Sequence, residues 1–137
     1  MTLLDVIVVG GGPVGLVTAL EARRAGLDVV VIEPRSSPID KPCGQGIMPA
    51  GVARLNELGI HPAGAEITAI RYASAGRSAT AAFRQGSGLG VRRTELSARL
   101  WEAVVDAGVR VIHSAATDFV PASTHVSVQV RSGEEVR

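Results

Sequence analysis

The chain has 137 residues, of which 46% are hydrophobic and 3% are aromatic, and its formal net charge is +1. A chain of one domain's length with this much apolar material is not a disordered protein, and aliphatic side chains must build its core. The balanced charge, with no basic block, argues against a nucleic-acid partner, and the single cysteine, Cys43, excludes an intrachain disulfide and a multi-cysteine zinc site.

An apolar run at residues 3–9 predicts a first strand that belongs to a parallel sheet and is covered on both faces. A helical pattern begins near Pro13 and is expected to end at Ala25-Gly26, because glycine is a common residue after a helix. The side chains that we expect this helix to bury are Val14, Val17, Ala19 and Leu20. A second apolar strand at residues 28–32 leads directly into Glu33.

Between the first strand and the helix lies a Gly-x-Gly-x-x-Gly turn at residues 10–15. Gly10 allows the tight turn, Gly12 allows backbone to approach a pyrophosphate, and Gly15 allows the helix to pack closely on the strand. The helix N-terminus adds free N–H groups and a partial positive charge that favour phosphate. This context predicts a dinucleotide-binding βαβ unit; the alternative is a βαβ turn with a purely structural role.

Glu33 stands where a carboxylate can accept hydrogen bonds from an adenosine ribose. Its negative charge argues against a 2′-phosphate, and therefore against NADP as the ligand of this site. Arg35 is the opposing observation, because an arginine at that position could bind such a phosphate. We give Glu33 the greater weight, since it would repel the phosphate at close range.

The segment after Glu33 differs from a regular crossover helix. Residues 34–46 are rich in proline and glycine and are expected to be extended, long enough to run beside a ligand larger than one nucleotide. A short helix follows at residues 50–58. Residues 66–73 and 79–84 then predict two strands, joined through 74–78, that leave the main sheet.

Residues 85–90 are expected to be a flexible glycine-rich return, with a second phosphate loop as the less favoured alternative. The second strong helix runs from residues 92–93 to 107, and its expected apolar stripe consists of Leu96, Leu100, Trp101, Val104 and Val105. A strand at 109–113 returns to the sheet. Strands at 117–121 and 125–130 and a stub from 134 predict a small antiparallel meander. The expected fold is α/β, with a Rossmann-like parallel sheet and this meander.

Three separated motifs resemble one superfamily of flavoproteins. Residues 5–15 with 33–35 resemble the FAD-binding start of the aromatic hydroxylases typified by p-hydroxybenzoate hydroxylase. Residues 41–49 and 51–52 resemble relatives that include geranylgeranyl reductases and tailoring oxygenases of secondary metabolism. Residues 91–96 resemble the hydroxylase segment that returns to the flavin.

The resemblance implies roles for particular residues. The pyrophosphate of FAD would be lined by Gly10, Gly12, Pro13, Val14 and Gly15. Glu33 would hold the adenosine ribose, Arg35 would lie on the adenosine and pyrophosphate side, and Arg93 would reach the pyrophosphate or ribityl chain. The loop from Cys43 to Gly46, with Gly44 between them, would pass near the isoalloxazine ring.

Plainer interpretations remain open for several of these side chains. Arg92 and Arg93 could be solvated at a helix start, and Cys43 could be a small buried hydrophobe rather than a group near the flavin. The three histidines, His61, His113 and His125, show no metal-ligand or triad spacing, so we expect no metal site. No catalytic residue can be named from the sequence.

The resemblance implies a flavin-dependent oxidoreductase, most simply a monooxygenase that takes electrons from NAD(P)H and hydroxylates or epoxidises a small organic substrate. A reductase of isoprenoid double bonds, similar to geranylgeranyl reductase, is the nearest variant. A truncated, non-catalytic dinucleotide-binding module is an alternative of another class. Half of an NAD-dependent dehydrogenase is disfavoured by the proline- and glycine-rich segment after Glu33.

Family members also carry an Asp-Gly motif, a Gly-Asp-x-Ala motif and a sheet that forms the substrate pocket, and this sequence contains none of them. We therefore expect residues 1–137 to be one FAD-binding domain, with the rest supplied by a longer form of the protein or by another chain. The missing part is expected to pair with a sheet edge left open near Val128. The lone cysteine and the shortness of the apolar runs favour a cytoplasmic protein without a membrane span.

Overall fold

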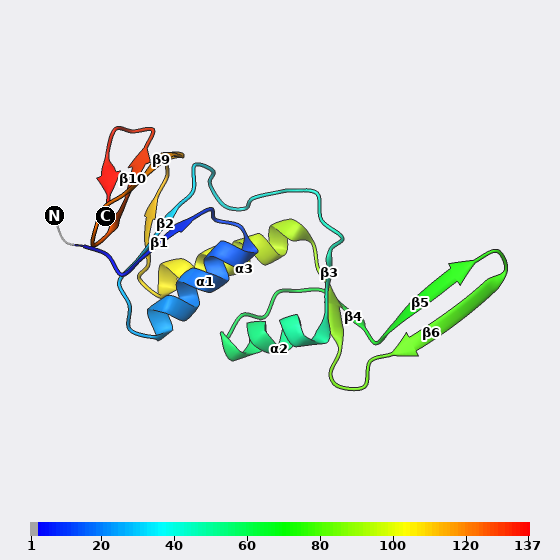
Figure 1. Cartoon of the computed structure of the whole chain (residues 1–137). Coiled ribbons are helices and arrows are strands. Elements are labelled where there is room, and N and C mark those ends of the chain that lie inside the picture. The colour runs from blue at the N-terminus through cyan, green and yellow to red at the C-terminus, as the bar shows by residue number, and fades with distance from the viewer. Residues whose placement is uncertain (1–2) are drawn as a thin grey trace.

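A computed structural model describes residues 3–137. Its elements in chain order are β1 (Val6–Val9), α1 (Pro13–Arg24), β2 (Val29–Ile32), β3 (Gly46–Ile47), α2 (Pro49–Glu57), β4 (Ala65–Ile67), β5 (Ala69–Ser74), β6 (Arg77–Ala82), β7 (Gly88–Gly90), α3 (Arg93–Asp106), β8 (Arg110–Ile112), β9 (Ala116–Pro121), β10 (Val126–Val130) and β11 (Glu135–Val136). Figure 1 shows a layered body at one end of the molecule and a long hairpin, β5–β6, projecting from the other.

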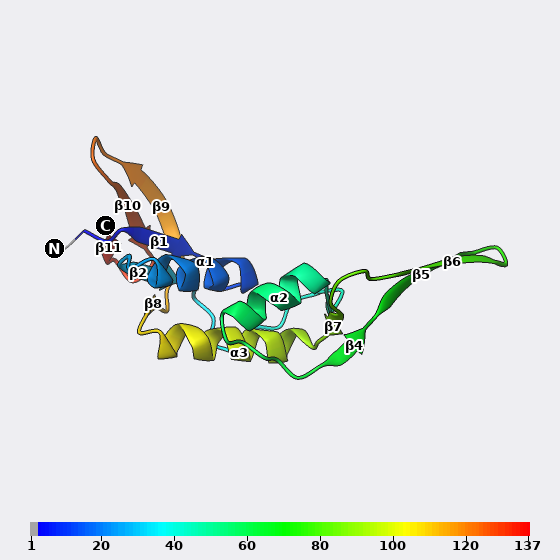
Figure 2. The same cartoon turned by 90° about the horizontal axis from the view of Figure 1, so that it is seen from below.

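The body is built on a parallel sheet in the order β1-β2-β8, as the alternation of strands and helices predicts. Val29 and Val31 of β2 pack with α1 and α3 in one core, whereas Val30 and Ile32 pack with the C-terminal meander in another. Every residue of β2 is buried, which explains why this strand is apolar throughout. Figure 2 shows the two helices and the meander on opposite sides of the sheet.

Both long helices have the expected limits, but each buries a somewhat different face. In α1 the buried side chains are Leu16, Ala19 and Leu20, whereas Val14 is 83% exposed. Leu16 and Leu20 are one turn apart, and Val14, two residues before Leu16, points away from them. In α3 the expected stripe is buried except for Val105, which is 64% exposed at the margin of the helix. The predictions for Val14 and Val105 were therefore wrong.

Residues 88–90 are not a flexible return: they form β7, the central strand of a small sheet in the order β3-β7-β4. Two glycines make this packing possible. A Cβ on Gly88 would lie 2.7 Å from the carbonyl oxygen of Ile47, and one on Gly64 would lie 2.5 Å from that of Gly90. Because the β7 backbone pairs with a strand on each side, it is not a second phosphate loop.

The predicted excursion from the main sheet is the β5–β6 hairpin. Its turn is shorter than expected, because Ala75 and Gly76 both adopt positive φ angles, 45° and 79°, and the ladder continues to the pair Ser74–Arg77. A two-residue hairpin turn with both central residues at positive φ matches the natural twist of two strands. The strands therefore extend to the turn itself.

The C-terminal meander has the order β11-β10-β9, so β10 is paired on both sides. The expectation of an open edge near Val128 was therefore wrong. In the described residues the parallel sheet has an unpaired edge at β1 and another at β8, because each of these strands pairs only with β2. Val8 is buried in the core on the helix side with Val6 packed against it, and Ile7 packs against the core on the meander side, so both faces of β1 are covered except at Val9, which is 46% exposed.

Candidate functional site

The carboxyl ends of β1 and β2 meet at the glycine-rich turn. The N–H of Gly10 donates to the carbonyl oxygen of Ile32 over 2.9 Å, and Gly10 has a φ of +112° that other residues rarely adopt. A Cβ on Gly15 would lie only 2.0 Å from the carbonyl oxygen of Gly10. Gly15 is therefore required for the close packing of α1 on β1, as its place in the motif predicts.

Gly12 has a different environment. The nearest atom to a Cβ built on it is Nη2 of Arg93, at 3.9 Å, so the space in front of this backbone is open. Gly12 is also the N-cap of α1; it offers no side-chain cap, and Pro13 follows without an acidic residue in the first turn. Free amide groups and an uncompensated helix dipole at an open backbone are the features that bind an anionic group.

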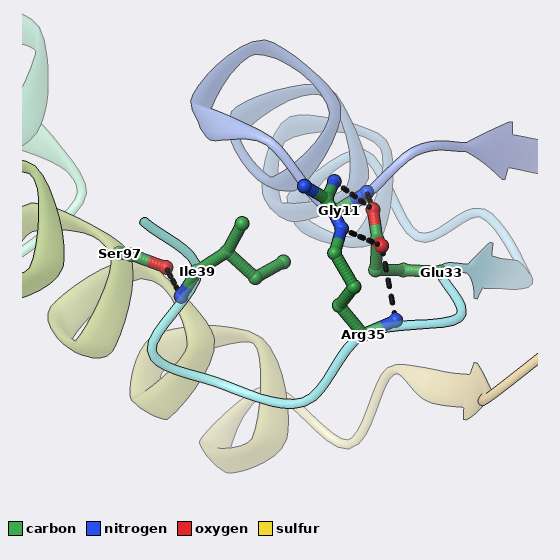
Figure 3. A network of polar contacts seen from close by, with 5 residues as sticks. All are labelled: Gly11, Glu33, Arg35, Ile39 and Ser97. Atoms are coloured by element: carbon green, nitrogen blue, oxygen red, sulfur yellow. Dashed lines mark hydrogen bonds and ion pairs between the residues drawn. The ribbon is translucent and has the colours of Figure 1, made fainter. Parts of the chain in front are cut away.

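Glu33 lies beside this turn and is only 2% exposed (Figure 3). Its Oε2 accepts the N–H of Gly11 over 2.8 Å, and its Oε1 accepts the N–H of Arg35 over 3.1 Å. The Arg35 guanidinium donates to both oxygens, from Nε over 2.8 Å and from Nη2 over 3.2 Å. The carboxylate is thus held in one orientation at the end of β2.

The hydrogen bonds also set the charge of Glu33. Burial raises the pKa of this carboxyl group, but the bonds from Arg35 and Gly11 outweigh burial and lower the pKa from its ordinary 4.5 to about 2. Glu33 is therefore ionised at neutral pH, and an ionised carboxylate can only accept hydrogen bonds. The same ion pair raises the pKa of Arg35.

Gly11 is a residue of the site that sequence reasoning missed. A Cβ at this position would lie 2.5 Å from Cζ2 of Trp101 and 2.8 Å from Cγ of Glu33. Gly11 thus allows the turn to rest directly on both side chains. The only sequence signal was that the x position between Gly10 and Gly12 of the motif is itself a glycine. Trp101 in turn stacks on His113, with ring centroids 6.2 Å apart.

Arg93, the first residue of α3, lies with its guanidinium near Gly12. Its Nε is buried and has no hydrogen-bond partner among residues 3–137, and its Nη2 is the atom closest to the Cβ position of Gly12. A buried unpaired donor is costly unless a ligand satisfies it. Gly12 and Arg93 therefore fit an anionic group such as a diphosphate.

The segment after β2 runs along α3. The Ile39 N–H donates to Oγ of Ser97 over 2.9 Å, which ties this segment to α3 (Figure 3). Further along, the exposed Cys43 thiol accepts the N–H of Gln45 over 3.4 Å. This bond lowers the pKa of Cys43, partial desolvation opposes it, and Arg93 lowers the pKa further.

The structure brings most of the predicted residues together, because the glycine turn, Glu33 and Arg35 form one cluster and Arg93 adjoins it. Gly44 lies on the Cys43 loop, and in the described part of the chain no atom beyond its two neighbours comes within 4 Å of its Cβ position, whereas Gly46 is part of β3 and pairs with Gly90. A cavity of about 660 Å³ adjoins this cluster, lined by the loop at Ser36, by Trp101 and by one face of α3. Residues 3–137 contain no cluster of metal-ligating side chains and no helix long and apolar enough to cross a membrane.

These features define a dinucleotide-binding α/β domain. Residues 3–135 match the family described as FAD binding domain, and the chain belongs to that family. The resemblance of its motifs to flavin-dependent hydroxylases and reductases is confirmed by the relatives described next, which include a reductase and a monooxygenase.

Over 56 residues the chain is 54% identical to the menaquinone reductase of Mycobacterium tuberculosis, a match that covers 41% of this chain and 14% of the reductase. Over 59 residues it is 46% identical to the para-nitrophenol 4-monooxygenase of a Pseudomonas species, covering 43% and 15% of the two chains. A solved geranylgeranyl bacteriochlorophyll reductase-like protein from Thermoplasma acidophilum superposes with a TM-score of 0.77 at 27% identity, over 99% of this chain and 37% of that one. The chain thus spans well under half of these proteins.

Proposed function

We propose that this chain is the FAD-binding portion of an NAD(P)H-dependent monooxygenase that acts on a small organic molecule. The observation that carries the proposal is the pairing of an open glycine backbone, Gly12, with a buried ionised carboxylate, Glu33, at the ends of adjacent parallel strands. The adenosine diphosphate end of a dinucleotide requires both features, because the diphosphate binds amide donors and the ribose hydroxyl groups donate to an acceptor.

Each residue has a definite task in this proposal. The pyrophosphate contacts the turn and the helix start, which comprise Gly10, Gly12, Pro13, Val14 and Gly15. Glu33 accepts hydrogen bonds from the adenosine ribose, Arg35 lies on the adenosine and pyrophosphate side, and Arg93 donates to the pyrophosphate or the ribityl chain. Gly44 and Gly46 allow their loop to approach the isoalloxazine ring.

When bound, the flavin would supply the redox and oxygen chemistry. The chain's own residues would bind it, orient it and exclude water from one side.

We further propose that residues 1–137 act as a single domain and that other polypeptide completes the substrate pocket, either as a continuation or as a separate chain. Support comes from the 37% share of the Thermoplasma protein that the chain spans and from the unpaired edge of β1. A strand added to β1 would extend the parallel sheet and cover Val9, which is 46% exposed. An exposed free thiol at Cys43 is in keeping with a cytoplasmic location.

A reductase of isoprenoid double bonds is the second candidate, and the 54% identity to menaquinone reductase favours it. The two candidates differ in their need for oxygen. With the completed protein, rapid consumption of NAD(P)H only in the presence of oxygen supports the monooxygenase. Consumption that continues in anaerobic buffer, given a reducible substrate, supports the reductase.

Cofactor choice can be tested on the chain itself. Purified protein is mixed with FAD, with ADP or with NAD, and is passed through a gel-filtration column. Co-elution of yellow FAD with the protein in equal molar amount supports the proposal. Retention of ADP or NAD without FAD points instead to a non-catalytic dinucleotide-binding module.

A further inference from the structure

The carboxylate of Glu33 already has all the hydrogen bonds it can accept. Two carboxylate oxygens offer about four lone-pair positions. Oε1 accepts from the backbone N–H and from Nε of Arg35, and Oε2 accepts from the N–H of Gly11 and from Nη2 of Arg35. A ribose hydroxyl group cannot be added to this set without the loss of a bond.

The four bonds are of two kinds. The N–H groups of Gly11 and Arg35 belong to the backbone, so they remain when a ligand enters. The other two bonds come from the Arg35 guanidinium, one to each oxygen, and that side chain is 45% exposed and free to leave into solvent. Figure 3 shows it lying along Glu33 as far as the turn at Gly11.

The two positions that the guanidinium fills match what a ribose requires. The 2′- and 3′-hydroxyl groups of a ribose are vicinal donors, and a carboxylate binds them best with one acceptor position on each oxygen. Departure of the Arg35 side chain would free one position on Oε1 and one on Oε2. The number of hydrogen bonds to Glu33 would then be the same before and after the exchange.

We propose that Arg35 is an internal competitor of the adenosine ribose: its guanidinium occupies the diol-binding positions of Glu33 in the ligand-free protein and must be displaced on binding. The inference rests on the proposed function, since it requires that a dinucleotide binds at this turn. Arg35 makes the site selective, because a ligand without a vicinal diol has nothing to exchange for the two bonds. The ion pair with Arg35 also keeps the Glu33 carboxylate ionised, with its negative charge balanced by the guanidinium, until the ligand binds.

The test compares two probes that share a diphosphate and differ in the diol, ADP and 2′,3′-dideoxy-ADP. Their affinities are measured by calorimetry for the wild type, Arg35→Gln and Arg35→Lys, with Arg131→Gln as a control that removes an equal charge from an exposed residue outside the site. Effects of charge on the phosphates are common to both probes, so the ratio of the two affinities isolates the ribose contribution.

We expect the ratio of ADP to dideoxy-ADP affinity to rise roughly three- to fivefold in Arg35→Gln, a value typical of one half-exposed ion pair. The ratio should rise less in Arg35→Lys, because lysine cannot form a bidentate contact with the carboxylate. It should be unchanged in Arg131→Gln. An unchanged or lower ratio in both Arg35 variants overturns the proposal while ADP binding itself persists. Failure of the wild type to bind either FAD or ADP overturns the proposed function and this inference with it.

Discussion

Two glycines of the same motif should respond to the same substitution in opposite ways. Gly15→Ala places a methyl group where the structure has no space, 2.0 Å from the carbonyl oxygen of Gly10. Gly12→Ala places it in open space, with Nη2 of Arg93 the nearest atom at 3.9 Å. We therefore expect Gly15→Ala to damage the fold and Gly12→Ala to damage ligand binding.

The magnitudes follow from these distances. Ordinary contact begins at 3.4 Å, so the first turn of α1 must move by more than 1 Å to accept alanine at position 15. Overpacking of this kind typically costs about 1–3 kcal/mol, and the better helix propensity of alanine returns up to about 1 kcal/mol. The net loss in the free energy of unfolding should be about 2 kcal/mol. At position 12 the loss should stay below about 1 kcal/mol, since only the N-cap preference changes.

Urea denaturation followed by the fluorescence of Trp101, the only tryptophan, measures the stability of each variant. FAD affinity is measured on the folded proteins. Gly12→Ala should bind FAD at least about tenfold more weakly, because the methyl group occupies the place of the pyrophosphate, an effect of about 1.4 kcal/mol. Wild-type FAD affinity in Gly12→Ala would refute the assignment of the turn, and wild-type stability in Gly15→Ala would refute the close packing.

Three further outcomes are expected. The carboxylate of Glu33 stabilises the fold above pH 4.5, and this contribution is lost as the pH falls through about 2. The difference in unfolding free energy between the wild type and Glu33→Gln should therefore shrink by up to about 3 kcal/mol on acidification. A difference that does not change with pH would contradict this stabilising role of the ionised carboxylate. Leu100→Ala, at a fully buried position, should cost about 2–5 kcal/mol in thermal or urea unfolding, whereas Val105→Ala, 64% exposed, should cost less than about 0.5. Cys43, whose pKa is lowered by the N–H of Gln45, should react with iodoacetamide at neutral pH faster than a model thiol; an equal rate contradicts this.

The parts of the fold that the sequence predicted are those encoded locally. Glycine and proline mark both ends of α1, and glycine follows α2 and α3, so their limits were close to those observed. The second apolar run was recognised as a strand, and the structure explains its composition, because every residue of β2 is buried. The order of strand, glycine turn, helix and strand specifies a right-handed parallel unit with little freedom.

The errors concern information that no local pattern contains. Helical periodicity limits the buried face of α1 to a broad stripe, so it did not distinguish Val14 from Leu16. Residues 88–90 form a strand only because β3 and β4 lie on either side of them, and three residues with two glycines carry no strand signal. Which strands have an open edge depends on the topology of the whole sheet, and β10, at the centre of the meander, has none.

The same distinction between local patterns and long-range contacts applies to the candidate site. The positions of Gly12, Gly15 and Glu33 follow from one short motif and the strand after it, so their proximity was predictable. The contact of Gly11 with Trp101 joins residues ninety positions apart in the chain, and no sequence pattern predicts it. The closed set of hydrogen bonds between Glu33 and Arg35 depends on side-chain orientation and emerges only from the structure.

In the proposed site a dinucleotide binds with its diphosphate at the start of α1. Titration of the nitrogen-15-labelled chain with FAD, followed by amide NMR, tests it most directly. We predict that the largest shifts fall on the amides of residues 10–15, with smaller ones at Glu33, Arg35 and Arg93. Shifts concentrated on the β5–β6 hairpin or on the cavity beside α3, with residues 10–15 unmoved, would contradict the account.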